Sequence, residues 1–323
     1  MAIGLVLLLL SPALLAGASA TVSIRNIDGA QVEGRTELRT LQVESKGKTI
    51  SYRLPEILSV HNGAPASEFE TERITAGLSA IQGSERKARD LAVEELTSIG
   101  LPALTPLLRT IKDTDQHEPR PLYRLFERLI PSSADDFDRT LSLVRIRGGG
   151  AIRGKLPEDA VEIRTADGSV VTIPWAKIRS LAVMRKSVQR SMPVHSLRHA
   201  TQIEYLDTGV VITAASKVTT DARGFVRLSW DADGWASDAD GLKKPGAPNY
   251  KTNLVDGHPF GALLGRIGAN SEAFLLGKKA AKTGLPPGRL TLAVNDNRHW
   301  QNNVGTYSVT MTATDAYDVG DAQ

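Results

Sequence analysis

Three oxygen-bearing side chains lie close together in the sequence near the C-terminal end of this chain. Asp296, Asn302 and Asn303 belong to the segment NDNRHWQNNVGTY, which runs from Asn295 to Tyr307. Carboxylate and amide oxygens are hard donors, and several of them converging from one loop, together with backbone carbonyls, typically form a Ca²⁺ site. A Ca²⁺ ion with open coordination positions also accepts sugar hydroxyls. The alternative is a polar hairpin turn, because aspartate and asparagine also form Asx-turns.

Two strand-like runs would position this loop. Upstream, Leu290–Val294 reads LTLAV and is strongly β-prone. Downstream, residues 307–311 alternate apolar and polar side chains, which is the period of a half-buried strand. The loop therefore connects two strands, and its oxygen donors are held between them.

Upstream segments, taken in order, resemble a known family. They are the run Leu206–Trp230, the stretch GWASDADG at Gly234–Gly241, and HPFGALLGRIG at His258–Gly268. Followed by the loop described above, this order resembles the LecA-like (PA-I type), calcium-dependent galactophilic lectins. In that family a tryptophan loop precedes a GAL-x-x-x-IG strand and an ND-containing loop. The resemblance covers residues 198–314 and implies a β-sandwich of jelly-roll type.

The resemblance also implies a ligand set for calcium. Asp296 would supply a carboxylate, and Asn302 and Asn303 would supply amide oxygens. Asp238, which follows the tryptophan loop, would supply its backbone carbonyl. The same three side chains would lie against the sugar, and two vicinal sugar hydroxyls would complete the coordination shell.

Two departures from the family pattern matter. The ligand loop is one residue shorter, so a second backbone carbonyl would come from either His299 or Trp300, and both remain open. Trp300 is also the candidate for stacking on a sugar ring. The segment Lys243–Gly257 replaces the family's loop that contacts the primary hydroxyl of galactose. Calcium binding therefore carries over better than galactose specificity, and the glycan stays open between a galactose-like sugar and a polysaccharide.

The rest of the chain predicts a mainly β, multidomain protein. An internal repeat gives two small β units, at 21–62 and 139–186, each with strands about glycine turns. This pattern suits SH3-like or Sm-like barrels, or two sheets packing on each other. Between the copies, residues 66–135 carry amphipathic helical periodicity of a HEAT-like kind. This helical block could also be an insertion into a split β domain.

The polar, basic stretch 187–197, which contains one proline, reads as a linker. The sandwich at 198–314 is therefore expected to fold alone when expressed from Arg198. Residues 315–323 read as a tail. His195 and His199 are spaced for one helical face, but they have no Glu or Cys partner nearby, so zinc is not expected.

Composition bounds the class of protein. A chain of 323 residues fits two or three domains. The net charge of +3 is small, with no basic cluster typical of nucleic-acid binding. The chain has no cysteine, which excludes disulfides and a cysteine-linked lipid anchor. No G-x-S-x-G, H-E-x-x-H or phosphate loop is present. We therefore expect a binding protein and not an enzyme.

The first twenty residues read as a secretory signal peptide. Residues 1–20 hold a short apolar run and end in Ala18-Ser19-Ala20, an A-x-A cleavage pattern. This run is too short for a stable membrane anchor. The expected location is the periplasm or the medium of a bacterium with Sec-type export. Ca²⁺ is plentiful outside cells, so even a weak site would be filled there.

Together these observations predict an exported carbohydrate-binding protein that uses a bound calcium ion. Two alternatives stay open. One is a structural or protein-interaction protein whose lectin-like sandwich no longer binds sugar. The other is a non-catalytic accessory subunit of a secreted polysaccharide hydrolase. The sequence leaves open whether the protein is a monomer or a homo-oligomer.

Overall fold

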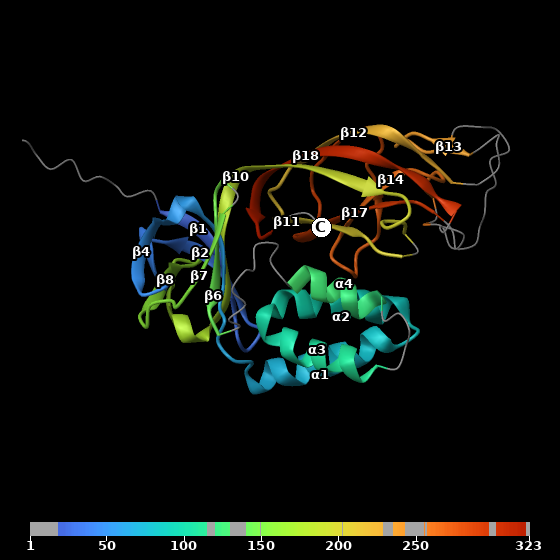
Figure 1. Cartoon of the computed structure of the whole chain (residues 1–323). Coiled ribbons are helices and arrows are strands. Elements are labelled where there is room, and N and C mark those ends of the chain that lie inside the picture. Colours follow the sequence, from blue (N-terminus) through green and yellow to red (C-terminus); the bar gives the residue numbers. More distant parts are fainter. Residues whose placement is uncertain are drawn as a thin grey trace, which may run out of the picture.

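The computed structural model describes residues 19–114, 120–129, 140–148, 150–201, 203–228, 235–242, 255, 257–296 and 302–320. These residues form a β domain, a block of helices and a β-sandwich, which confirms a mainly β, multidomain protein. In Figure 1 the helices lie beneath the sandwich and beside the β domain, and most strands belong to the two β regions. The expected signal segment, except for its last two residues, lies outside the described residues.

Each repeat copy contributes five strands to the β domain. In the first copy they are β1 (Ala20–Asn26), β2 (Gln31–Thr36), β3 (Thr40–Ser45), β4 (Lys48–Arg53) and β5 (Ile57–His61). In the second copy they are β6 (Ser142–Ile146), β7 (Gly150–Gly154), β8 (Ala160–Arg164), β9 (Val170–Pro174) and β10 (Ile178–His195). A short 3₁₀ turn precedes the last strand of each copy, at Leu54–Glu56 and at Trp175–Lys177.

The two copies exchange strands instead of forming separate barrels. The first strand of copy one, β1, pairs with the last strand of copy two, β10. The last strand of copy one, β5, pairs with the first strand of copy two, β6, and also with β10. One hydrophobic core results, and it draws on both copies: Val22, Ile24, Leu41, Val43, Leu54, Ile57, Val60, Val144, Val161, Ile163, Ile173, Trp175, Ile178, Leu181 and Val183.

Two equivalent glycines allow the copies to cross. Gly34 lies in β2, and a Cβ atom there would come within 2.4 Å of the Arg164 carbonyl oxygen at the end of β8. Gly154 lies in β7, and a Cβ atom there would come within 2.5 Å of the Glu44 carbonyl oxygen in β3. Real side chains do not tolerate such distances from backbone atoms. The repeat therefore keeps glycine at the point where each copy's second strand meets the other copy's third.

The helical block is inserted between the copies. It comprises α1 (Glu68–Gln82), α2 (Arg86–Ile99), α3 (Leu104–Asp113) and α4 (Arg120–Leu129). These helices enclose a core of their own: Ile74, Leu78, Ile81, Ala92, Leu96, Ile99, Ala103, Leu104, Leu107, Leu122, Leu125 and Leu129. Helix α1 starts with a capping box, in which Ser67 Oγ accepts a hydrogen bond from Glu70 N and Glu70 Oε2 accepts one from Ser67 N.

Among the described residues, no single helix is long and apolar enough to cross a membrane. The segments Arg86–Ile99 and Leu101–Asp113 pass that test only when taken together, with a bend of 114° between them.

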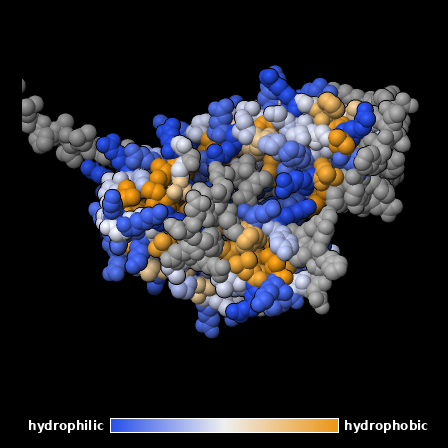
Figure 2. Space-filling model, viewed as in Figure 1, coloured by the Kyte–Doolittle hydropathy of each residue, from blue (hydrophilic) through white to orange (hydrophobic). Residues whose placement is uncertain are grey.

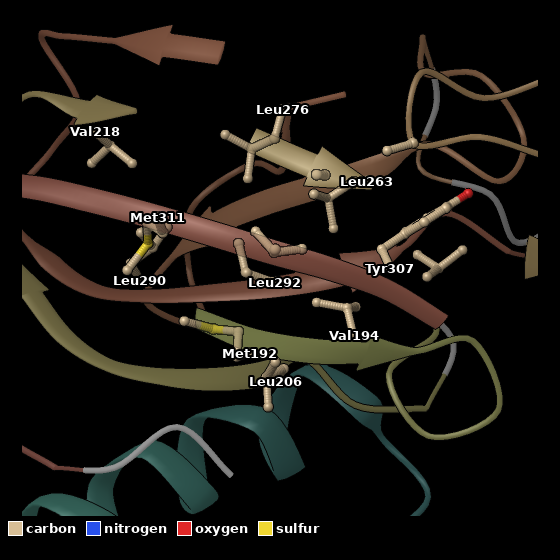
Figure 3. Close-up of a cluster of buried hydrophobic side chains, with 14 of the residues drawn as sticks. Met192, Val194, Leu206, Val218, Leu263, Leu276, Leu290, Leu292, Tyr307 and Met311 are labelled. Carbon is tan, nitrogen blue, oxygen red and sulfur yellow. The ribbon is translucent and has the colours of Figure 1, made fainter. Parts of the chain in front are cut away.

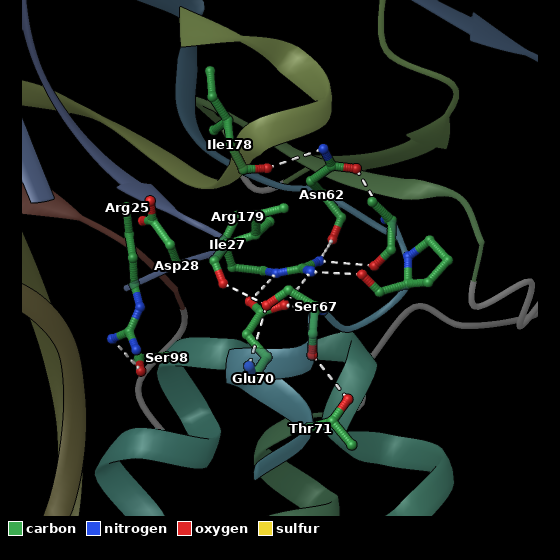
Figure 4. Close-up of polar contacts among 12 residues, drawn as sticks. Arg25, Ile27, Asp28, Asn62, Ser67, Glu70, Thr71, Ser98, Ile178 and Arg179 are labelled. Carbon is green, nitrogen blue, oxygen red and sulfur yellow. Dashed lines mark hydrogen bonds and ion pairs between the residues drawn. The ribbon is translucent and has the colours of Figure 1, made fainter. Parts of the chain in front are cut away.

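A buried ion pair fastens the helical block to the β domain. Arg179 on β10 and Glu70 on α1 are 1% and 2% exposed, and they meet in a two-pronged contact of 2.6 and 2.7 Å. The same guanidinium donates to the carbonyls of Asn62, at 2.8 Å, and Ala64, at 2.9 Å. Figure 4 shows this cluster, with Arg179 at its centre. The charges are thus taken out of water only where each has partners, which is the condition for a buried ion pair to be tolerated.

The expected linker at 187–197 is wrong for most of its length. Residues up to His195 continue β10, which pairs with β1 in the β domain and then with β18 (Val304–Asp318) from Met184 onward. Along this second half Val188 and Met192 point into the sandwich core and their neighbours face solvent. A strand with one polar, basic face and a proline reads as a linker in sequence. Figure 1 shows β10 rising from the β domain and continuing along the sandwich.

The sandwich has two facing sheets. One contains the second half of β10, β18, β12 (Val218–Arg227), β13 (Ala236–Ser237) and β16 (Lys279–Lys282). The other contains β11 (Leu206–Ile212), β17 (Gly288–Val294), β14 (Leu263–Ile267) and β15 (Phe274–Leu275). The far end of β18 also pairs with β11 and joins the two sheets. Apolar side chains fill the space between them (Figure 3).

Ionic contacts hold the helical block against the sandwich. Arg266 on β14 meets Asp90 on α2 at 2.9 Å, and its guanidinium carbon lies 4.0 Å from the centre of the Tyr205 ring. Glu204, in the turn before β11, pairs with Arg124 on α4 at 3.1 Å and also with Arg128. Through these contacts the three units form one packed body. Figure 2 shows a mostly hydrophilic visible surface on the described residues, with smaller hydrophobic areas.

Because β10 contributes to the sandwich core, we predict that residues 198–323 do not fold alone. This fragment lacks Val188, Met192 and Val194, and it leaves one edge of β18 without its partner strand. A fragment of residues 184–323 restores both. Circular dichroism and size-exclusion chromatography should show a cooperative melt and a monodisperse peak only for the longer fragment. Equal melting temperatures for the two fragments would contradict the role given to β10.

We predict that Glu70→Gln lowers the free energy of unfolding by about 3–5 kcal/mol, because it leaves the Arg179 charge buried without its carboxylate. Glu68→Gln, in the same helix turn but exposed, serves as the control and should change it by less than about 0.5 kcal/mol. Urea denaturation of the full chain measures both. Similar effects of the two substitutions would show that the ion pair contributes little.

Candidate functional site

Two of the three predicted side-chain ligands, Asp296 and Asn303, meet at one end of the sandwich, and the third, Asn302, is the sequence neighbour of Asn303. Asp296 follows β17, and Asn302 and Asn303 immediately precede β18. Asp296 is 1% exposed and Asn303 is 4% exposed, which is unusual for a carboxylate and an amide in a connecting loop. Asn303 Nδ2 donates a hydrogen bond to Asp296 Oδ2, so the two side chains are in direct contact. The two ends of the loop are therefore joined through buried polar groups.

Two oxygen atoms in this cluster have no hydrogen-bond partner among the described residues. Asn303 Nδ2 also donates to the Ser196 carbonyl at 3.1 Å, which fixes the orientation of the amide. Within the described part of the chain, the Oδ1 atoms of Asn302 and Asn303 are buried and accept no hydrogen bond. Leaving a buried acceptor unsatisfied costs about 1–3 kcal/mol. A cation is one kind of partner that could satisfy such oxygens. The Asn303 amide turns its Nδ2 atom toward Asp296, so Asn303 Oδ1 and Asp296 would share one ion only after this amide turns over.

The backbone of Asp296 is fixed by a residue far away in sequence. Thr201 Oγ1 donates to the Asp296 carbonyl at 3.0 Å, and Asp296 N donates to the same Oγ1 atom at 3.1 Å. Thr201 N also donates to the Val294 carbonyl at 2.9 Å. These bonds hold the start of the ligand loop through its main chain. Sequence analysis missed Thr201, because it lies 95 residues upstream and has no motif around it.

Asn295 holds a second loop in place. Its side chain is fully buried, and its Nδ2 atom lies 3.1 Å from the His258 carbonyl and 3.2 Å from the Pro259 carbonyl. Its Oδ1 atom accepts a hydrogen bond from Val255 N at 3.0 Å. The asparagine thus ties the approach to β14 to the end of β17. Of the adjacent pair, Asn295 therefore positions the neighbouring loop, and Asp296 contacts the Asn303 side chain.

Asp238 is held at the same end of the sandwich by Tyr307. The Tyr307 hydroxyl lies 2.9 Å from the Asp238 carbonyl and 2.8 Å from the Gly261 carbonyl. In Figure 3 this hydroxyl points away from the apolar cluster. The Asp238 carbonyl also accepts from Gly241 N at 2.9 Å and from Ser237 Oγ at 2.8 Å. The Asp238 carbonyl oxygen would therefore have to lose one of these hydrogen-bond donors before it could coordinate a cation, which is the role that the lectin resemblance implies.

His299 and Trp300 lie outside the described residues. Trp235 is partly buried and packs edge-on against Phe260, with ring centres 6.4 Å apart. Among the described residues, no three His, Asp or Glu side chains gather where they could hold a metal ion. A cation at this end of the sandwich would therefore depend on the asparagine oxygens.

His199 supports the turn that carries Thr201. Its carbonyl accepts from Val294 N at 2.8 Å, and its Nδ1 atom accepts from His195 N at 3.1 Å. An accepting Nδ1 must be unprotonated. Burial, together with the charges of His195 and nearby arginines, lowers the pKa of His199 from 6.5 to about 3. The imidazole is therefore neutral in the folded protein.

We predict that acid weakens the protein partly through His199. Its folded pKa lies below its unfolded value, so its contribution to stability is complete above pH 6.5 and is lost as the pH falls toward 3. Between pH 8 and pH 5 the loss is about 2 kcal/mol in the free energy of unfolding. His199→Gln keeps an acceptor and should reduce the loss by that amount in urea titrations. The buried His61, also lowered to about 3, acts equally in both proteins. Identical pH dependence would refute this assignment.

Comparison with known proteins gives little beyond the fold. No family model matches this chain, and no curated protein sequence matches it. Among solved structures, the chain is similar to the EclA N-terminal domain, a PllA-like lectin, with 23% sequence identity and a TM-score of 0.30. The match covers 39% of this chain and 96% of that structure. The similarity is one of fold alone.

Proposed function

We propose that this protein binds carbohydrate through a calcium ion held by Asp296, Asn302 and Asn303. The observation that carries the proposal is the buried Asp296 carboxylate in contact with the Asn303 side chain, together with two buried oxygens, Oδ1 of Asn302 and of Asn303, that have no partner in the described chain. A polar turn, the alternative for this loop, would direct such oxygens to water or to backbone N–H groups. A bound cation would supply the partner that these oxygens lack.

The chemistry of the donors favours Ca²⁺ over other ions. All three side chains offer oxygen, which suits hard cations, and they include no sulfur or imidazole that would favour zinc. Ca²⁺ accepts amide and backbone oxygens in irregular geometry, whereas Mg²⁺ demands a near-ideal octahedron and keeps its waters. A single carboxylate among neutral donors also suits a weak site of the kind found outside cells. The proposal therefore includes export, guided by the apolar segment at 1–20.

Carbohydrate is the ligand that this ion would recruit. Three side chains do not complete the six to eight oxygen ligands of Ca²⁺. Two vicinal hydroxyls of one sugar would fill neighbouring positions, and Asp296 and the two asparagines would lie against them. The described residues include no group that is placed to choose between galactose and its epimers. Monosaccharide binding should therefore be weak, with a Kd of about 0.1–10 mM.

We predict that Ca²⁺ raises the melting temperature of the full chain and that Asp296→Asn abolishes the rise. A ligand that binds only the folded state stabilises it by about 2.7 kcal/mol at one hundred times its Kd. Asp296→Asn keeps the shape of the side chain and removes its charge. Asp113→Asn, an exposed carboxylate at the end of α3, is the matched control and should leave the rise unchanged.

Sugar binding completes the test. Calorimetric titration with D-galactose, D-mannose and D-glucose should give heat in millimolar calcium, none with chelator, and none with Asp296→Asn. A calcium-induced rise without any sugar heat would favour the structural alternative, in which the ion only orders the loop. No rise in melting temperature at all would remove calcium from the proposal.

A further inference from the structure

Exposed apolar side chains gather beside the candidate ion site. Of the six large hydrophobic side chains that are exposed among the described residues, three belong to one corner of the sandwich. They are Phe225 on β12, which is 64% exposed, Val304 at the start of β18, which is 55% exposed, and Leu197 after β10, which is 47% exposed. The largest apolar patch on a typical monomer covers roughly 300–600 Å² and is often functional.

Strand register places these residues on one outward face. Thr306 of β18 lies between His195 of β10 and Phe225 of β12, and all three point away from the core. Val304 occupies the next outward position along β18, where it is exposed. Ser196 then bonds the intervening Gly305 carbonyl, which brings the following Leu197 to the same corner. We call His195, Leu197, Phe225, Val304 and Thr306 the rim platform.

We propose that the rim platform is a second carbohydrate subsite, which binds a further unit of an oligosaccharide whose first unit is coordinated at the calcium ion. This inference rests on the proposed function. Phe225 would stack against the apolar face of the sugar ring, and the polar groups beside it would contact ring hydroxyls. The protein would then recognise a chain of sugars in preference to a single one.

The platform is continuous with the ion site. Val304 directly follows the candidate ligand Asn303 in sequence. Thr306 lies three residues beyond Asn303, about 10 Å along an extended strand. Ser196 links the two regions, since its carbonyl accepts from Asn303 Nδ2 and its Oγ donates to the Gly305 carbonyl at 3.0 Å. A monosaccharide at the ion does not span this distance, whereas an oligosaccharide does.

Polar groups flank the aromatic ring as a sugar would require. His195 Nδ1 lies 2.8 Å from Thr306 Oγ1, which fixes the imidazole on the outward face. The Nε2 atom of His195 makes no hydrogen bond to the described residues, so it can meet a sugar hydroxyl. Arg227, across from Val304 on β12, is exposed at the edge of the platform. Apolar and hydrogen-bonding groups thus alternate over a small area.

The size of the platform argues against a second copy of this chain as its occupant. Three side chains of this type, each about half exposed, present on the order of 300 Å². A stable protein–protein interface needs about 800 Å² from each partner. The neighbouring outward positions on β12 are Arg223 and Arg227. Both are exposed and charged, so they do not enlarge the apolar area. The area matches one or two sugar rings better than a protein face.

The test compares monosaccharides with oligosaccharides on the full chain. Calorimetric titration uses galactose with a β-1,4-linked galactotetraose, and mannose with mannotetraose, in millimolar calcium. For at least one pair the tetrasaccharide should bind about tenfold more tightly, or about 1.4 kcal/mol. Phe225→Ala should remove this preference and leave the Kd of the monosaccharide unchanged, and Phe225→Trp should keep the preference. Tyr123→Ala, an exposed aromatic on α4, is the control and should change neither.

Each other outcome has a distinct meaning. Equal affinity for monosaccharide and tetrasaccharide, or a preference that survives Phe225→Ala, overturns the second subsite and leaves the proposed function intact. Absence of calcium-dependent heat with every sugar overturns both. Light scattering is run on the same samples, and dissociation of an oligomer by Phe225→Ala would identify the platform as an interface between copies and overturn the subsite.

Discussion

The strand β10 belongs to two hydrophobic cores at once, and the arrangement of the whole protein depends on this constraint. Its first half lies between β1 and β5 in the β domain, and its second half pairs with β18 in the sandwich. The same strand carries Arg179, which binds the helical block. Neither core can close without it, so the three units are fixed relative to one another by a continuous backbone as well as by side chains.

The sequence predicts local features of this fold well. Strands on either side of the candidate site, the helical character of the middle segment and the doubled β pattern all follow from periodicity and turn residues. The linker at 187–197 was wrong because a strand that is buried on one face only, with polar residues on the other, differs little from an irregular polar segment. The exchange of β1 and β5 between copies was also missed, because strand pairing over more than a hundred residues leaves no local mark.

The candidate site also contains some residues that the sequence reveals and others that only the structure reveals. Asp296, Asn302 and Asn303 could be found from their types and spacing, since a loop of oxygen donors is visible in the chain itself. Thr201, Ser196 and the roles of Asn295 and Tyr307 could not, because each acts through a contact formed only after the sandwich closes. The residues that would touch an ion are thus local, and the residues that hold them are distant. The helical block reaches this network through Glu204, three residues after Thr201.

The helical block has an unusual point of attachment. It leaves the β domain after β5 and returns at β6, and these two strands pair antiparallel, with His61 opposite Leu143. Four helices therefore connect two strands that a tight hairpin turn could have connected. An insertion at such a place alters neither strand order nor register, so the helices are coupled to the β domain only through side-chain contacts such as Glu70 with Arg179. Substitutions in the insert that spare these contacts can accumulate while the strands around it stay the same.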